Sequence, residues 1–211
     1  MLTCLPMEGL VHAFVVLFVV VDPVGLAPIY AGLAAGLPED ERQRTALRAV
    51  ALSAGLLLAF AFTGRQILGA LGISLPAFRI AGGLLLFLLA VDMVFVRHSG
   101  LRTTTPAERE EARRREDISV FPLAFPLIAG PGALTTVLLL ASGEEGAPGW
   151  LGLTLVILAV IAVTAAALCL ATRITRLLGE TGANVVTRVL GLVVAALAVQ
   201  YVLDGVRAAL A

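Results

Sequence analysis

Asp22-Pro23-Val24-Gly25 interrupts a long apolar run that extends from Gly9 to about Gly36. An aspartate followed by a proline is typical of a helix start, because the carboxylate caps free amides and proline fits the first helical position without losing a hydrogen bond. The stretch therefore predicts that one half-helix ends and another begins here. The run as a whole is long enough to cross a bilayer.

A similar interruption occurs about a hundred residues later, where Gly130, Pro131 and Gly132 divide a second apolar run. Gly130 can cap the new half-helix and Pro131 can open it, as Pro23 does in the first run. Two interrupted helices at matching positions of two halves are typical of the binding sites of secondary transporters.

The composition indicates a membrane protein. Of the 211 residues, 59% are hydrophobic and only 14% are charged, and the mean hydropathy is +1.00. Several apolar runs approach or exceed the ~20 residues that a helix needs to span a bilayer. The first seven residues carry no lysine or arginine, so we expect the first run to be a retained helix rather than a signal peptide.

We expect an all-α, polytopic membrane protein in a single membrane domain, residues 1–211, with the first and fourth of six helices broken mid-membrane. The expected spans cover residues 9–36, 45–63, 77–96, 118–142, 150–172 and 185–206. Residues 98–117 form a charged linker. Its acidic residues offset its arginines, which argues against a nucleic-acid partner.

The two halves of the chain repeat each other. At offsets of 109 or 110 residues, Gly69, Gly72, Arg79 and Gly82 recur as Gly179, Gly182, Arg188 and Gly191. Chance matching in a glycine-rich chain is the alternative explanation. We assign repeat one to residues 8–97 and repeat two to 118–207. Because each repeat holds three spans, the second enters the membrane from the opposite side, and the repeat is inverted.

The arginines determine the expected orientation. The connections after the first, third and fifth spans, together with the helix ends that adjoin them, receive 12 of the 15 basic residues. The positive-inside rule then places these connections in the cytoplasm and both termini outside the cell membrane.

Three separated motifs carry a family resemblance: Asp22–Gly25 with Pro28, Gly72–Leu84, and Pro126–Gly132. They resemble motifs of the MarC family of bacterial and archaeal inner-membrane proteins, and the resemblance covers essentially the whole chain. It implies a location in the inner membrane and a relationship to LysE-type amino-acid exporters. It also implies small neutral substrates such as glycine and alanine, which an archaeal member carries. Some members have asparagine where this chain has Asp22.

The two breaks predict a substrate site. Both second half-helices begin near the membrane centre, and we expect unpaired amides on Val24, Gly25 and Leu26 and on Gly132, Ala133 and Leu134. Two converging helix N-termini suit a carboxylate, and glycines leave the backbone open to close approach. The expected substrate-binding residues are Asp22, Val24, Gly25, Leu26, Gly130, Gly132, Ala133 and Thr135. The alternative is that the prolines only bend helices and the glycines only pack them.

Two types of side chain near the breaks have alternative roles. Asp22 either caps its half-helix or holds a substrate ammonium group or a coupling proton, because ionisable groups at this depth are often functional. Thr135 and Thr136 either donate to a ligand or satisfy a local carbonyl.

The sequence predicts a secondary transporter of small neutral amino acids that works by alternating access. The expected partners are a small zwitterion, a coupling proton or sodium ion, and the lipid bilayer. The spacing of Gly32 and Gly36 suits close helix packing or association between copies. The alternatives are an intramembrane enzyme acting on lipid or peptide, a channel, or a non-transporting scaffold. We expect no enzyme activity, metal or cofactor, because no nucleophile–base pair, Cys/His cluster or nucleotide-binding loop is recognisable.

Overall fold

The computed structural model of the chain describes residues 7–95, 118–142 and 149–211. The expected linker, 98–117, lies outside these residues. The described part is helical and contains no strand, which confirms the all-α class. Its elements are α1 (Met7–Val21), α2 (Pro23–Leu33), α3 (Glu39–Ala70), α4 (Leu75–Phe95), η1 (Ser119–Ile128), α6 (Pro131–Ala141), α7 (Trp150–Cys169) and α8 (Ala171–Leu210).

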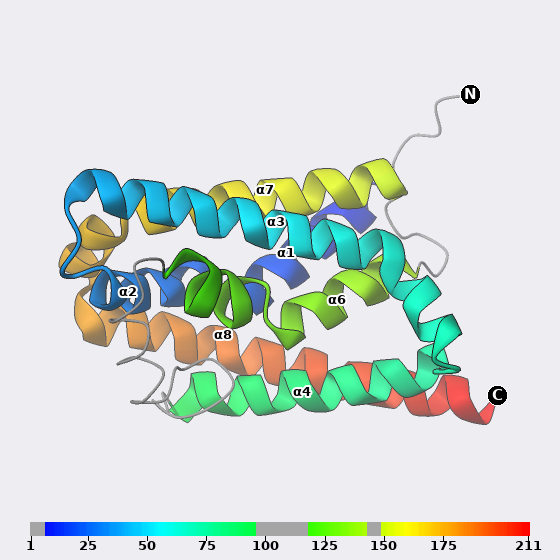
Figure 1. Cartoon of the computed structure of the whole chain (residues 1–211). Coiled ribbons are helices and arrows are strands. Elements are labelled where there is room, and N and C mark those ends of the chain that lie inside the picture. The colour runs from blue at the N-terminus through cyan, green and yellow to red at the C-terminus, as the bar shows by residue number, and fades with distance from the viewer. Residues whose placement is uncertain (1–6, 96–117, 143–148) are drawn as a thin grey trace.

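The helices are arranged in three layers (Figure 1). Helix α3 packs against α7 on one side of the bundle, and α4 packs against α8 on the other. The interrupted elements α1, α2, η1 and α6 lie between these two pairs. The breaks therefore lie in the interior of the bundle.

Five helices in the described residues are long and apolar enough to cross a membrane, α1 and α2 together making one of them. The sixth would be η1 with α6, which are bent by 57° relative to each other. The outer faces of α4 and α8 carry large exposed apolar side chains, among them Leu84, Leu88 and Leu192. Such faces suit contact with lipid tails.

Glycines bring α4 and α8 into close contact. A β-carbon at Gly83 would lie 2.8 Å from the carbonyl oxygen of Ala198, and one at Gly191 would lie 2.9 Å from Cβ of Met93. Small residues at such positions let membrane helices approach closely. In contrast, Gly32 and Gly36 have no neighbouring atom within 4 Å of a β-carbon, so the expectation of close packing within the chain is wrong for this pair.

Two helices extend further than the hydropathy predicted. Helix α3 already begins at Glu39 and continues to Ala70, because its acidic first turn favours a helix start outside the apolar core. Helix α8 begins at Ala171 and bends at Gly179, whose φ of 64° suits glycine. Hydropathy marks the apolar part of a helix rather than its ends.

The first half of the expected fourth span is not a regular α-helix, contrary to the prediction. Phe121 and Phe125, which precede prolines, have extended conformations with φ/ψ of −131°/128° and −132°/128°. Both Phe–Pro peptide bonds are cis. A proline disfavours the helical conformation of the residue before it, and two such pairs four residues apart prevent a continuous helix.

The C-terminal end of α2 is fastened to α3. The Tyr30 hydroxyl donates a hydrogen bond to the carbonyl oxygen of Arg42 at 2.5 Å. The Arg42 guanidinium donates to the carbonyl oxygens of Ala34 and Ala35 at 2.9 and 3.2 Å. A cation at this position satisfies the last carbonyls of a helix and is favourable near its negative end.

Candidate functional site

The first break lies at a single residue. Asp22 has φ 49° and ψ 67°, the left-handed conformation, and separates α1 from α2. Its amide still donates to the carbonyl oxygen of Phe18 at 2.9 Å, and its carbonyl accepts from Leu26 at 3.1 Å. Aspartate tolerates this conformation better than most residues. The break therefore changes the helix direction while keeping much of the backbone hydrogen bonding.

The Asp22 carboxylate is fully buried and links two elements. Oδ1 accepts a hydrogen bond from the Gly25 amide at 3.0 Å. Oδ2 accepts one from Thr187 Oγ1, on α8, at 3.3 Å. The capping role expected for Asp22 is thus present, and a connection to α8 is added to it.

Gly25 makes room for this connection. A β-carbon at Gly25 would overlap Asp22 Oδ2 and would lie 2.6 Å from Thr187 Oγ1. The space beside Gly25 is thus filled by these two side chains, rather than left open for a ligand as the sequence suggested.

The expectation of six unpaired amides is wrong for half of them. The Gly25 amide is capped, the Leu26 amide donates to the Asp22 carbonyl, and the Leu134 amide donates to the Gly130 carbonyl at 3.0 Å. The amides of Val24, Gly132 and Ala133 precede the first intrahelical bond of their helices, so no acceptor exists for them within the helical ladder. These three are the donors that a ligand could use.

The second break has a different chemistry. Gly130 is the N-terminal cap of α6, with an extended conformation and no side chain to cap the amides. A β-carbon at Gly130 would overlap the carbonyl oxygen of Pro126. Here glycine is required by the close approach of the backbone, whereas a carboxylate occupies the matching position of the first half.

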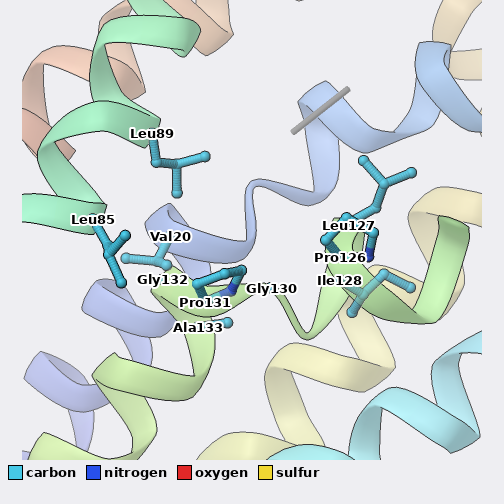
Figure 2. A pocket seen from close by; sticks show the side chains of 10 residues that line it. All are labelled: Val20, Leu85, Leu89, Pro126, Leu127, Ile128, Gly130, Pro131, Gly132 and Ala133. Atoms are coloured by element: carbon cyan, nitrogen blue, oxygen red, sulfur yellow. The ribbon is translucent and has the colours of Figure 1, made fainter. Parts of the chain in front are cut away.

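The two breaks lie next to each other. A β-carbon at Gly132 would lie 3.5 Å from Cγ1 of Val20, two residues before Asp22, and 3.1 Å from Cδ2 of Leu89. Figure 2 shows Val20, Leu85 and Leu89 around the start of α6. The last turn of α1 therefore contacts the start of α6.

A small apolar cavity of about 20 Å³ lies at this junction, which is room for about one water molecule. Its lining comes from two elements of the first half, α1 and α4, and from the segment of η1 and α6 in the second: Val20, Leu85, Leu89, Pro126, Leu127, Ile128, Gly130, Pro131, Gly132 and Ala133. Asp22, Val24, Gly25 and Leu26 are not among these residues. The expected site thus divides into a polar part around Asp22 and an apolar part at the second break.

The threonines of α6 contact two other helices. Thr135 is buried, and its methyl group lies where a β-carbon of Gly82, on α4, would be. Thr136 is fully buried close to Tyr201 of α8. Thr136 Oγ1 has no hydrogen-bond partner of good geometry within the described segments. Thr135 therefore packs α6 against α4.

Thr187 was missed by the sequence analysis. It lies 165 residues from Asp22, and no local pattern distinguishes it from other threonines of the chain. It comes directly before Arg188 in the repeat, where the first half has Phe78 before Arg79. A polar residue in place of an apolar one at matched positions was the available signal.

The described residues give no positive indication of a metal site. Within residues 7–95, 118–142 and 149–211, no group of three or more histidine, cysteine, aspartate or glutamate side chains could hold a metal ion.

Comparison with known proteins places the chain in a family. The model for "MarC family integral membrane protein" matches residues 7–210. The UPF0056 membrane protein YvbG of Bacillus subtilis is 36% identical over 198 residues, 94% of each chain. The UPF0056 membrane protein MJ0972 of Methanocaldococcus jannaschii is 37% identical over 198 residues, 93% of this chain and 86% of the relative. No solved structure matches. Both helix breaks and all the described helices fall within the matched range, and the chain belongs to the MarC family of integral membrane proteins.

Proposed function

We propose that this protein is a secondary transporter of small neutral amino acids such as glycine and alanine, and not an enzyme. The observation that carries the proposal is the junction of the two broken elements, with a buried carboxylate on one side and uncapped helix amides on the other. Broken helices of this kind hold substrates in several transporter folds. The enzyme alternative has less support, because the residues that line the cavity at the junction include no histidine, cysteine or acidic side chain that could act as a base or a nucleophile.

The depth of the junction supports the proposal. Asp22 lies 14 residues after Glu8 and 11 before Leu33, the ends of the first span. At 1.5 Å per residue these separations are roughly 21 and 17 Å. The carboxylate is therefore near the middle of the span, where an ionisable side chain is costly unless it has a function.

The packing of the helices supports an inverted repeat. Gly83 of α4 lies against Val202 of α8, and Gly191 of α8 lies against Met93 of α4, so the two helices are antiparallel. In an inverted repeat, each contact should recur between the matching residues of the two halves. With an offset of 109 residues, Gly83 matches Leu192 and Val202 matches Met93, so the Gly83–Val202 contact predicts a contact between Leu192 and Met93. The observed contact is between Gly191 and Met93, one residue away from the predicted pair. Near-symmetric contacts of this kind suit alternating access by rocking one repeat against the other.

In this mechanism a zwitterion binds at the junction. Its carboxylate accepts hydrogen bonds from the amides of Val24, Gly132 and Ala133, at the positive ends of α2 and α6. Asp22 holds the ammonium group or carries a coupling proton or sodium ion. Binding at the junction then allows the repeats to open the site to each side in turn.

The test is counterflow in proteoliposomes. Purified protein should exchange external labelled glycine for internal unlabelled glycine and alanine, and protein-free liposomes should not. A channel would equilibrate the label without accumulating it transiently. Absence of counterflow for all the common amino acids would refute the proposal and leave a scaffold role.

In the proposed topology the protein lies in the inner membrane, with both termini on the outer side of that membrane. We expect an alkaline phosphatase fusion at residue 105 to be inactive and a green fluorescent protein fusion there to be fluorescent, because the arginine-rich connections remain in the cytoplasm. Fusions after Ala211 should give the reverse pattern. An active phosphatase at residue 105 would contradict this orientation.

A further inference from the structure

The contact between Asp22 and Thr187 joins the broken helix to the α4–α8 pair. Thr187 Oγ1 donates to Asp22 Oδ2 at 3.3 Å. One turn further along α8, Gly191 is packed against Met93 and Val94 of α4, with a β-carbon position 2.9 to 3.2 Å from their atoms. The hydroxyl is thus carried by a helix that is closely fixed to its neighbour.

Both oxygens of the carboxylate take part in this arrangement. Oδ1 accepts from the Gly25 amide, and Oδ2 faces Thr187. The absence of a side chain at Gly25 lets the hydroxyl approach. A carboxylate that accepts from two elements has a fixed rotamer, whereas a helix cap alone restrains only one oxygen.

We propose that Thr187 is a positioning residue for Asp22. Its hydroxyl fixes the orientation in which the carboxylate meets the ammonium group of a small amino acid, and it makes that orientation depend on the placement of α8. This inference rests on the proposed transport function and identifies an additional residue of its site.

Thr187→Val and Thr187→Ser test the inference, because valine retains the shape and loses the hydroxyl, whereas serine retains the hydroxyl. We expect Thr187→Val to raise the KM for glycine about tenfold with little change in Vmax, as for the loss of one hydrogen bond to a charged group. Thr187→Ser should restore a KM near that of the wild type. Thr181→Val, an exposed site on the same helix, is the matched control and should leave both constants unchanged.

A second measurement does not depend on transport. Thermal unfolding of the purified protein should show that Thr187→Val lowers Tm in the wild type but has little further effect in Asp22→Ala, which lacks the acceptor. An unchanged KM, a fall in Vmax alone, no rescue by serine, or additive Tm shifts would overturn the inference. Wild-type protein without counterflow would instead refute the proposed function, and the Tm cycle would still decide whether the two residues are coupled.

Discussion

Asp22→Ala is expected to abolish transport and to destabilise the protein, whereas Asp22→Asn should retain the fold. Alanine removes the hydrogen bond that caps the Gly25 amide, a loss of about 1 kcal/mol. It also adopts the left-handed conformation of this position less readily than aspartate does, which costs roughly a further 1 kcal/mol. We therefore expect a free energy of unfolding lower by about 2 kcal/mol.

Asparagine keeps both features. Its side-chain oxygen can accept from the Gly25 amide, and its amide group can donate to Thr187 Oγ1, with the hydroxyl hydrogen turned elsewhere. It also adopts the left-handed conformation well. Asp22→Asn therefore changes the charge at the break with little change in shape.

The two variants separate the roles of the carboxylate. If Asp22 carries the coupling ion, Asp22→Asn should still catalyse glycine exchange but should lose accumulation driven by an imposed proton or sodium gradient. If it holds the substrate ammonium, exchange should fall as well. The measurements are counterflow, gradient-driven uptake and urea or thermal unfolding at matched expression. Asp22→Ala with wild-type transport would show that neither role applies.

The sequence was sufficient to predict features that depend on neighbouring residues. The break at Asp22 and Pro23 follows from the capping carboxylate and the missing amide of proline, which act within one turn. Gly82 and Gly191, at matched positions, both mark close helix contacts, Gly82 with Thr135 of α6 and Gly191 with Met93 of α4, although the expected role of the pair was only a repeat. The break is local, so a single chain segment contains the information that predicts it, whereas the glycines indicate a close contact without identifying the partner helix.

Features that depend on distant residues could not be predicted in the same way. The Thr187 hydroxyl meets Asp22 only because α8 packs beside α2. For the same reason, Gly25 was interpreted as open space for a ligand, although side chains from two elements fill that space. The departure of Phe121 and Phe125 from helix geometry was missed because packed membrane helices often tolerate proline. The effect of two Phe–Pro pairs four residues apart was underestimated.

In the proposed transporter, the apolar cavity at the second break would limit the size of the substrate side chain. Its volume is about 20 Å³, and Leu85 and Leu89 of α4 form its wall opposite Gly132. A space of this size accepts about one methyl group. Alanine could place its methyl group there without moving the leucines, and glycine needs no such space. The larger side chain of valine would not fit unless the leucines moved.

We expect Leu89→Ala to extend the substrate range to valine. Each additional buried methylene contributes about 0.8 kcal/mol, so the two extra carbons of valine should improve its transport relative to alanine by roughly tenfold. Leu88→Ala is the control, because this neighbouring side chain is 54% exposed on the outer face of α4. Truncation of a buried leucine costs about 2–5 kcal/mol of stability, so Leu89→Val provides a milder variant for the same comparison.

Filling the cavity, the opposite change, should narrow the range of amino acids that are transported. In Gly132→Ala the new methyl group would lie 2.9 Å from Cδ2 of Leu86 and 3.1 Å from Cδ2 of Leu89, so it would fill the cavity once these flexible side-chain ends had shifted slightly. We therefore expect glycine transport to persist while alanine transport falls about tenfold or more, since the alanine methyl then has no space. Competition of unlabelled glycine, alanine, valine and leucine against labelled glycine measures both variants. If Leu89→Ala and Gly132→Ala both transport glycine with the wild-type order of competitors, the cavity does not hold the substrate side chain.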